Sequence, residues 1–292
     1  MMAWVYVSWL LIMEAMAAHA STSTNFEEIK YPDSRLREDL QQLSDGLTED
    51  NQYYSSLVHS RSLYDQQLSI AADCADHLMG GAITSGVYYI YPFTCSCRKP
   101  VPVWCDMETD GGGWTVFLTR QTQDSQVDFN RWWQEYKSGF GDPHGEYWLG
   151  NEHLHQMTSS RSYSVRVDFT SDAGVSYYLY RTFIKVASEA ERYGLSLGAV
   201  ASYNTSTGCF ATSGSPSFST KDQDYDSATG NCAVTKGGGW WYYNCLYNNP
   251  TSPYNSGLSF TCYPKRVIKL SKLQVKIRPT AFNSSLCRSC YQ

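Results

Sequence analysis

The chain has no excess of positive charge. Its 292 residues include 23 Lys and Arg against 28 Asp and Glu, which gives a formal net charge of -5. Because phosphate backbones are bound by clustered Lys and Arg, this balance argues against nucleic acid as the main partner. With 42% hydrophobic and 15% aromatic residues, the chain is long enough for one sizeable core and an accessory segment.

The common catalytic signatures are also missing. There is no Gly-x-Ser-x-Gly elbow, no His-Glu-x-x-His pair, no P-loop and no dinucleotide-binding glycine pattern. The glycines at residues 111–113 precede a predicted strand, whereas a phosphate-binding loop opens a helix. His153 and His155 are spaced so that a helix separates their rings, which disfavours a shared metal. The sequence therefore predicts a protein that is not an enzyme.

Apolar runs that could anchor the chain are absent after the N-terminus. Residues 3–13 are mostly apolar and lead to Ala-His-Ala at residues 18–20, a small-x-small cleavage site. The run is too short to span a bilayer core, which disfavours a transmembrane anchor. Residues 1–20 are therefore interpreted as a secretory signal peptide, although no Lys or Arg precedes the run and Glu14 interrupts it. Secretion is predicted, without membrane insertion.

A heptad pattern occupies residues 33–72. Apolar residues recur at alternating four- and three-residue steps, and only Asp50 and Arg61 break the seam. Asp33 or Ser34 provides a helix N-cap. The pattern fits a short coiled coil or one amphipathic helix packed on its own domain. The seam consists of Leu36, Leu40, Leu43, Leu47, Tyr54, Leu57, Tyr64, Leu68 and Ala71.

An acidic stretch lies at residues 222–226, where every second residue is Asp. Ca²⁺ takes about six to eight oxygen ligands from carboxylates and backbone carbonyls. An EF-hand is excluded, because the sixth position from Asp222 is Ser227 rather than Gly and the twelfth is Ala233 rather than Glu. The local pattern fits a calcium loop and a solvated surface loop equally well.

Between residues 73 and 279 lies a series of aromatic, glycine and cysteine blocks. They are residues 74–77 (Cys-Ala-Asp-His), 84–92 (Thr-Ser-Gly-Val-Tyr-Tyr-Ile-Tyr-Pro), 104–117 (beginning Trp-Cys-Asp-Met), 129–141 (beginning Phe-Asn-Arg-Trp), 146–152 (Glu-Tyr-Trp-Leu-Gly-Asn-Glu), 232–245 (Cys-Ala-Val-Thr-Lys-Gly-Gly-Gly-Trp-Trp-Tyr-Tyr-Asn-Cys) and 275–279 (Val-Lys-Ile-Arg-Pro). In their sequence and order these blocks resemble the fibrinogen C-terminal domain family, which includes fibrinogen, ficolins, tachylectins, angiopoietins and tenascins.

The resemblance implies an α+β fold: a twisted antiparallel central sheet, short helices and a loop-rich calcium and ligand end, preceded by a short coiled-coil helix. The residue patterns themselves indicate strands at 86–91, 114–119, 162–168, 176–185 and 273–278, helices at 129–136 and 151–157, and a loop-rich stretch over 208–263. The predicted organisation is a signal peptide at 1–20, a helical stem at 21–72, the fibrinogen-like domain at 73–280 and a cysteine-containing tail at 281–292. Because family members commonly carry an oligomerising stem, the coiled coil and a homo-oligomer are preferred.

The ten cysteines fit the oxidising environment of a secreted protein. The resemblance implies disulfides between Cys74 and Cys105 and between Cys232 and Cys245. The pairing of the other six stays open, and the two in the tail could join chains; these six are Cys95, Cys97, Cys209, Cys262, Cys287 and Cys290. Asn204 and Asn283 begin glycosylation tripeptides.

The resemblance also implies a calcium site and a ligand pocket beside it. The family's calcium ligands fall on Asp224, Asp226 and the backbone carbonyls of Ala228 and Gly230, with Asp222 outside the coordination sphere. Lys236 stands where sugar-binding members have Tyr, and Leu246 where they have His. The predicted pocket residues are Lys236, Trp240, Tyr242, Tyr243, Asn244, Leu246, Tyr254 and Asn255; for Trp240 the alternative is a place in the core.

Two classes of function follow. The first is a secreted, calcium-dependent pattern-recognition lectin of innate immunity that binds acetylated or acidic glycans on microbial surfaces. The second is a non-enzymatic ligand or matrix component that acts through a cell-surface receptor, as angiopoietins and tenascins do. The lectin is preferred, because the two aspartates and both cysteines of the calcium segment are present.

Overall fold

The computed structural model describes residues 71–93, 99–204, 215–245, 250–254, 258–262 and 266–282. The predicted signal peptide, all but the last two residues of the predicted stem, and residues 283–292 of the tail lie outside these ranges. The coiled coil therefore stays a prediction. No helix within the described ranges has the length and apolar character needed to cross a membrane.

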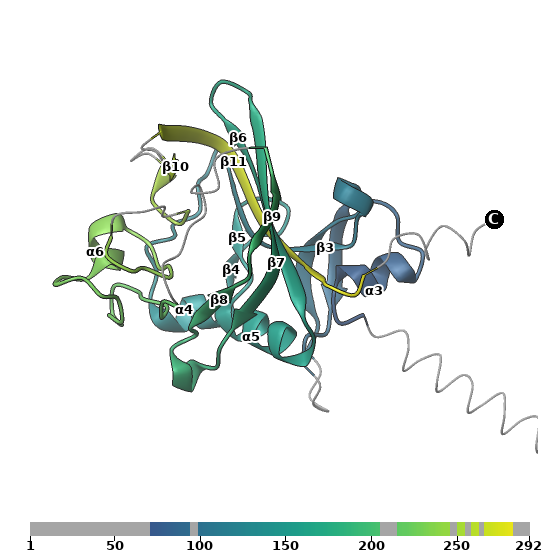
Figure 1. The fold of residues 1–292 in the computed structure, drawn as a ribbon, viewed down its shortest axis with the longest axis horizontal. Coiled ribbons are helices and arrows are strands. Elements are labelled where there is room, and N and C mark those ends of the chain that lie inside the picture. The colour runs from purple at the N-terminus through teal and green to yellow at the C-terminus, as the bar shows by residue number, and fades with distance from the viewer. Residues whose placement is uncertain are drawn as a thin grey trace, which may run out of the picture. The chain divides into compact units, whose positions relative to one another are not determined.

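A mostly antiparallel sheet forms the centre of the domain, with short helices around it (Figure 1). Its main strand order is β1-β2-β3-β11-β6-β7-β8, with β5 on β3, β9 on β7 and β10 on β11. The strands are β1 Gly86–Ile90, β2 Val101–Asp106, β3 Trp114–Gln121, β4 Phe140–Gly141, β5 Tyr147–Trp148, β6 Tyr163–Ser171, β7 Ser176–Val186, β8 Leu195–Leu197, β9 Val200–Tyr203, β10 Ser259–Cys262 and β11 Arg266–Pro279. The helices are α3 Cys74–Met79, α4 Trp133–Ser138, α5 Asn151–Ser160 and α6 Cys232–Lys236, with short 3-10 turns η1 Thr109–Gly111 and η2 Glu189–Glu191.

The last long strand, β11, lies in the middle of the sheet between β3 and β6. Alternate residues of β6, such as Val165, Val167 and Phe169, are buried, as expected for a strand with one face on the core. All residues of β3 except the last are buried, because the strand is covered on both faces. The α+β fold and the strands predicted from the sequence are confirmed.

One detail of the prediction was wrong. The helix expected at residues 129–136 begins only at Trp133, because Phe129 is buried in the core and the chain before α4 is extended at Trp132. The end predicted to be loop-rich also holds two short elements, α6 and β10. Both elements are short, and their sequences carry little of the periodicity that marks longer helices and strands.

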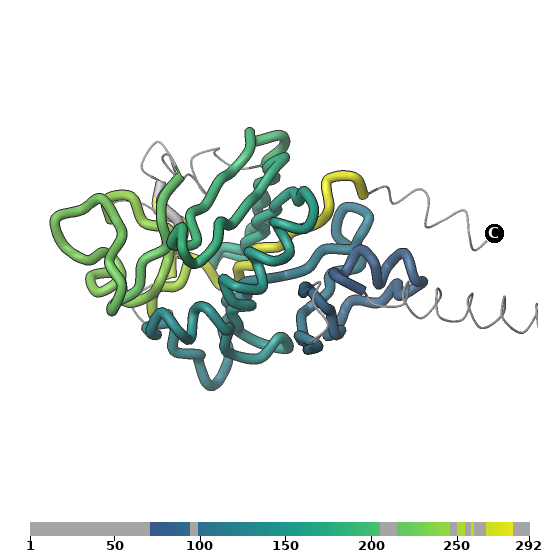
Figure 2. Tube along the Cα trace, turned by 90° about the horizontal axis from the view of Figure 1, so that it is seen from below, coloured from purple at the N-terminus to yellow at the C-terminus, as the bar shows by residue number. Residues whose placement is uncertain are grey.

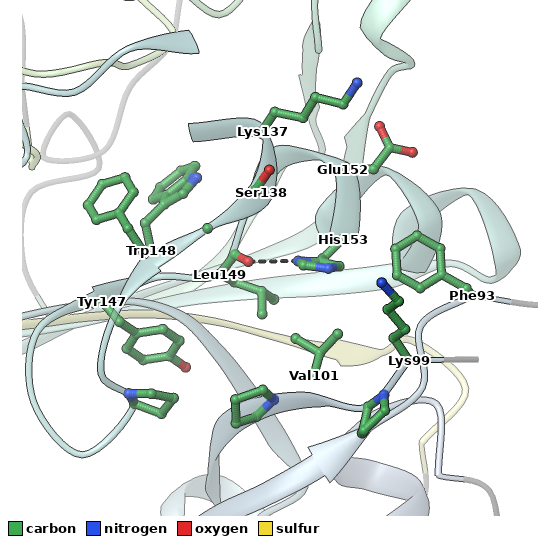
Figure 3. Close-up of a pocket in the computed structure, with 16 residues that line it drawn as sticks. Phe93, Lys99, Val101, Lys137, Ser138, Tyr147, Trp148, Leu149, Glu152 and His153 are labelled. Carbon is green, nitrogen blue, oxygen red and sulfur yellow. Dashed lines mark hydrogen bonds between the residues drawn. The ribbon is translucent and has the colours of Figure 1, made fainter. Parts of the chain in front are cut away.

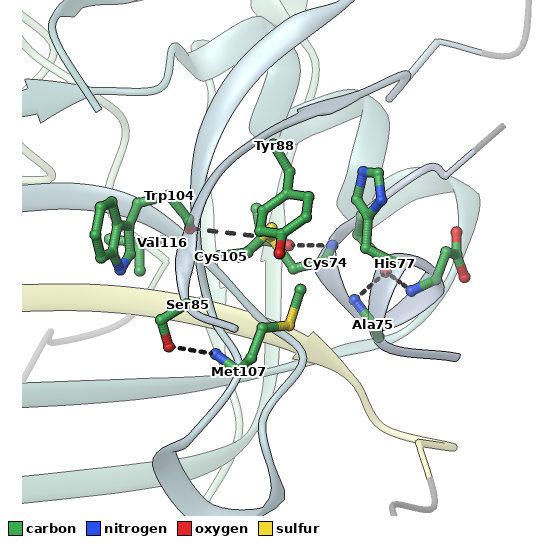
Figure 4. The surroundings of a disulfide bond; sticks show 12 residues. Cys74, Ala75, His77, Ser85, Tyr88, Trp104, Cys105, Met107 and Val116 are labelled. Atoms are coloured by element: carbon green, nitrogen blue, oxygen red, sulfur yellow. Dashed lines mark hydrogen bonds between the residues drawn. A yellow bond between two sulfur atoms is a disulfide. The ribbon is translucent and has the colours of Figure 1, made fainter. Parts of the chain in front are cut away.

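The disulfide between Cys74 and Cys105 joins α3 to β2, as predicted (Figure 4). Asp73 caps α3 by accepting hydrogen bonds from the amides of Ala75 and Asp76. The amide of Cys74 donates to Oγ1 of Thr115 on β3. These bonds fix the first helix of the domain to the central sheet.

Both ends of the described domain lie near α3. Figures 1 and 2 show α3 and the end of β11 on one side of the domain, with α6 and its neighbouring loops on the other. Phe282, just after β11, lines a hollow together with Ala75 and Met79 of α3. The predicted calcium and ligand end therefore lies opposite the point where the stem would join.

Candidate calcium and ligand site

The acidic loop, residues 218–231, leads into α6 and is held mainly by its own polar contacts. The amide of Ala228 donates to Oδ1 of Asp226 and the amide of Cys232 to Oδ2, both at 2.8 Å. Asp224 is exposed, and its Oδ1 accepts a longer bond of 3.3 Å from the amide of Asp226. The side chain of Asp226 therefore shapes the loop, while that of Asp224 stays accessible.

The carboxyl groups of Asp224 and Asp226 lie close together. Loss of surrounding water and repulsion by the Asp226 carboxylate raise the pKa of Asp224, against the lowering effect of its hydrogen bond to the Asp226 amide. Two acids held side by side resist full ionisation, and a bound cation would relieve their repulsion. Carboxylate oxygens beside an exposed loop backbone are the donors that Ca²⁺ prefers, so these residues fit the expected ion.

Asp222 connects the acidic loop to α4 through its hydrogen bonds. Its Oδ1 accepts hydrogen bonds from the amide of Trp133, at 2.9 Å, and from the hydroxyl of Thr220, at 2.7 Å. The amide of Trp133 is one of the unpaired donors at the start of α4. Asp222 thus connects the acidic loop to a helix 89 positions earlier in the sequence.

The segment after the acidic loop is fixed at both ends. Asn231 caps α6 by accepting from the amide of Val234, and the second predicted disulfide joins Cys232 to Cys245. Gly238 makes a close approach that excludes a side chain, because a Cβ there would lie 2.3 Å from the backbone oxygen of Thr251. The Gly-Gly-Gly run thereby brings residues 250–254 against α6.

The aromatic residues of this segment divide between core and surface. Trp240 and Tyr242 are 4% and 3% exposed, which disagrees with their predicted place in a pocket wall. The hydroxyl of Tyr242 donates to the oxygen of Gly238, and the ring of Trp240 packs on Trp241. Tyr243, at 48% exposed, is the ring of this run that a ligand could reach. Sequence alone could not separate these neighbours, because all are aromatic.

The side chain of Tyr254 is held by hydrogen bonds to neighbouring strands and is only partly exposed. Its hydroxyl donates to the backbone oxygen of Ser271 at 2.7 Å and lies 3.0 Å from the hydroxyl of Thr122. These contacts hold the ring against β11 and the end of β3. Tyr254 is partly buried, so part of its surface faces solvent.

A buried ion pair, not predicted from the sequence, holds the segment that carries Tyr254. Arg120 Nε lies 2.7 Å from Oε1 of Glu146, and both side chains are almost fully buried. Nη1 of Arg120 donates to the backbone oxygens of Pro250 and Ser252 at 2.9 and 2.8 Å. The guanidinium also lies 4.1 Å from the centre of the Phe129 ring. Removing one partner of such a pair leaves an uncompensated buried charge.

Other predicted site residues are only partly described. Lys236 is the partly buried last residue of α6, and Asn244 is partly buried before Cys245. Leu246, Asn255 and Asn283 lie outside the described residues. So do Cys95, Cys97, Cys209, Cys287 and Cys290, whose pairing stays open, and of Cys262 only the backbone in β10 is described. Asn204 is exposed at the end of β9, where glycosylation stays a prediction.

Residues 70–280 match the family described as "Fibrinogen beta and gamma chains, C-terminal globular domain". Because this match covers most of the chain, the protein belongs to that family. Among its relatives, Tenascin-N of Mus musculus is 35% identical over 273 residues, covering 88% of this chain and 17% of that protein. Angiopoietin-4 of Mus musculus is 41% identical over 184 residues, covering 63% of this chain and 35% of that protein. The chain therefore spans less than two thirds of the length of these relatives.

Solved structures agree with the fold. The "Fibrinogen-like globe domain of human ANGPTL2" has a TM-score of 0.64 and 32% identity, covering 72% of this chain and 99% of that one. A lamprey fibrin D-dimer in complex with the peptide Gly-His-Arg-Pro-amide has a TM-score of 0.64 at 22% identity, covering 97% of this chain and 96% of that one. The second likeness concerns the fold alone.

Proposed function

We propose that this protein is a secreted, calcium-dependent lectin that binds acetylated or acidic glycans on microbial surfaces and has no enzymatic activity. The observation that carries the proposal is the pairing of the Asp224 and Asp226 carboxyl groups in the exposed loop before α6. Together with the carbonyls of Ala228 and Gly230, they would hold one Ca²⁺. A cation there would order the loop beside Tyr243 and α6 and so couple glycan binding to calcium.

The preference for acidic glycans comes from Lys236 at the end of α6. An ammonium group is strongly hydrated and is costly to bury without a partner, so it would contact a ligand at the pocket rim. Carboxylate and sulfate groups of glycans are suitable ligands. Exposed ion pairs contribute about 0–1 kcal/mol, so the preference over neutral N-acetylhexosamine is modest and weakens as salt rises.

A second function is favoured by the relatives. Tenascins and an angiopoietin are similar to this chain over most of the domain, so a protein ligand or matrix component acting through a cell-surface receptor is the alternative. In that case the exposed loops around Tyr243 would contact protein instead of sugar. Calcium would then have only a structural role.

A glycan array separates the two functions. Wild type, Asp224→Ala and Lys236→Tyr are compared with calcium and with chelator. A lectin binds glycans in calcium, loses binding in chelator and in Asp224→Ala, and shifts toward neutral N-acetylhexosamines in Lys236→Tyr. Binding to no glycan under any condition would support the receptor ligand. Glycan binding that is unchanged in chelator and in Asp224→Ala would contradict the calcium site.

A further inference from the structure

A cavity lies away from the acidic loop. It has a volume of about 570 Å³, within the range of small-molecule sites. None of its lining residues belongs to residues 215–254, so it is distinct from the proposed glycan site. Its walls come from the ends of α4 and β5, the start of α5 and residues 99–102 at the start of β2 (Figure 3).

The walls of the cavity are largely apolar. Val101, Leu149 and Tyr147 lie along one side in Figure 3, and Phe93 lies at the far end. The hydroxyl of Tyr147 donates to the backbone oxygen of Val116, so it is already satisfied within the protein. A ligand body that contacts this side is therefore apolar, because it finds hydrocarbon and ring surface there.

Most of the polar groups in the lining have partners. Lys137 forms an ion pair with Glu189 at 2.5 Å. Glu152 accepts hydrogen bonds from the hydroxyl of Tyr193 and from the side-chain amide, Nε2, of Gln156. Lys99 is different: it is exposed and forms no ion pair within the described part of the chain. Among the described residues that line the cavity, Lys99 is thus a lysine at the rim without an ion-pair partner, in a chain of net charge -5.

His153 adds a hydrogen-bond acceptor. Its Nδ1 lies 2.8 Å from the backbone oxygen of Leu149, and this oxygen can only accept, so Nδ1 carries the hydrogen. Burial lowers the pKa of His153, against its bond to Leu149 and the nearby Glu152, so the ring is neutral at neutral pH. Nε2 of this ring is then an acceptor, and it suits an N–H donor on a ligand.

We propose that this cavity binds an N-acylated apolar amino acid with a free carboxylate. The carboxylate would contact Lys99, the amide N–H would donate to Nε2 of His153, and the apolar side chain would lie along Val101 and Leu149. A small N-acyl amino acid and the C-terminal residue of a peptide both offer this chemistry. The site needs no calcium, since no residue of the acidic loop lines it.

The test uses the full secreted chain and N-acetyl-L-phenylalanine as the probe, with binding followed by calorimetry. The neutral amide of the probe should bind about fivefold more weakly, because it lacks the charge that meets Lys99. Lys99→Met should weaken the acid by a similar factor and leave the amide unchanged. Lys185→Met, which removes an exposed lysine on β7 outside the cavity, is the matched control and should change nothing.

Two further variants probe the rest of the cavity. Ser138→Trp fills it from an exposed position and should abolish binding at an unchanged melting temperature. His153→Phe should remove the preference for the probe over its N-methylated form. A peptide ending in phenylalanine with a free carboxylate, compared with its amidated form, distinguishes a peptide terminus from a small acid.

Three outcomes would overturn the proposal: no binding of the acid to wild type, equal binding of acid and amide, or an unchanged affinity in Ser138→Trp. Loss of binding in chelator would instead assign the probe to the acidic loop. Failure of the glycan experiment leaves this test unaffected, since the two sites share no residues.

Discussion

Asp226 and Asp224 lie two positions apart in the acidic loop and differ in their hydrogen bonds. Both oxygens of Asp226 accept backbone amides at 2.8 Å, which closes the loop onto the start of α6. Asp224 accepts a bond of 3.3 Å from the amide of Asp226 and is exposed. Asp226 thus shapes the loop through its own hydrogen bonds, whereas the main role of Asp224 would be to bind the proposed ion.

Replacing the two aspartates should therefore change the free energy of unfolding by different amounts. In chelator, Asp226→Ala should lower the free energy of unfolding by about 1–3 kcal/mol, because two partly buried amides lose a charged acceptor. Asp224→Ala should change it by less than about 0.5 kcal/mol, as is usual for exposed positions. Millimolar calcium should raise the melting temperature of wild type, since it binds the native state, and of neither variant. An equal calcium shift in Asp224→Ala would remove Asp224 from the site.

At the scale of the elements, β11 is held to its neighbours by charge as well as by backbone bonds. Nζ of Lys276 is buried and lies 2.6 Å from Asp106 at the end of β2 and 2.5 Å from Asp168 on β6. Asp106 also accepts the amides of Glu108 and Thr109. This cluster connects three strands on one side of the sheet.

The cluster gives the domain an acid-sensitive contribution to stability. Burial favours the neutral form of Asp106, but attraction and hydrogen bonding by Lys276 outweigh it and lower the pKa to about 2 from the ordinary 3.8. A lowered pKa stabilises the fold above the unfolded value, and that stability is lost as pH falls through the folded value. Chemical unfolding at pH 5 and pH 2 should show that wild type loses about 2 kcal/mol more than Asp106→Asn.

Asp124→Asn, at an exposed position, serves as the control for this experiment and should follow wild type. Asn at residue 106 keeps an oxygen for the two amides, so the comparison isolates the charge. Identical pH dependence in wild type and Asp106→Asn would show that the Lys276 contact does not depend on that charge.

At the scale of the whole molecule, the side of the domain at α3 is separated from the side that carries the acidic loop and α6. The chain enters the domain at α3 and leaves it beside α3, while the acidic loop and α6 lie on the other side (Figure 2). If a stem joins subunits at α3, the proposed glycan site of every subunit would stay exposed. Several weak sites on one oligomer bind a repetitive surface far more strongly than one site does.

The stem should account for assembly. A chain without the predicted signal peptide, residues 21–292, should form an oligomer by light scattering, and a chain of residues 71–282 should be a monomer, because the heptad seam is removed. In the full secreted chain, Cys287→Ser together with Cys290→Ser shows whether the tail links chains covalently. An oligomer that persists in residues 71–282 would place the subunit contact on the globular domain instead.

The sequence by itself determined the main strands, because patterns such as the alternating apolar residues of β6 depend only on neighbours along the chain. The family and both described disulfides were predicted from the resemblance of the glycine and cysteine blocks, since Cys74 and Cys105 are 31 positions apart and no local pattern pairs them. The assignment of Asp224 and Asp226 to a calcium site also comes from that resemblance and stays a proposal, because the local pattern fits a solvated surface loop equally well.

Only the tertiary structure decided which side chains are free to act. In the folded domain, Trp240 and Tyr242 are buried. Asp222 accepts a hydrogen bond from the first amide of α4, and Arg120 donates to the backbone of residues 250 and 252. The fold also brought Lys99 and His153 to one cavity. The Asp222 and Arg120 contacts join residues 89 and 130 positions apart, and the packing of the sheet decides them rather than any local propensity. A run of adjacent aromatic residues does not show which rings face the core, because that choice depends on the elements packed against them.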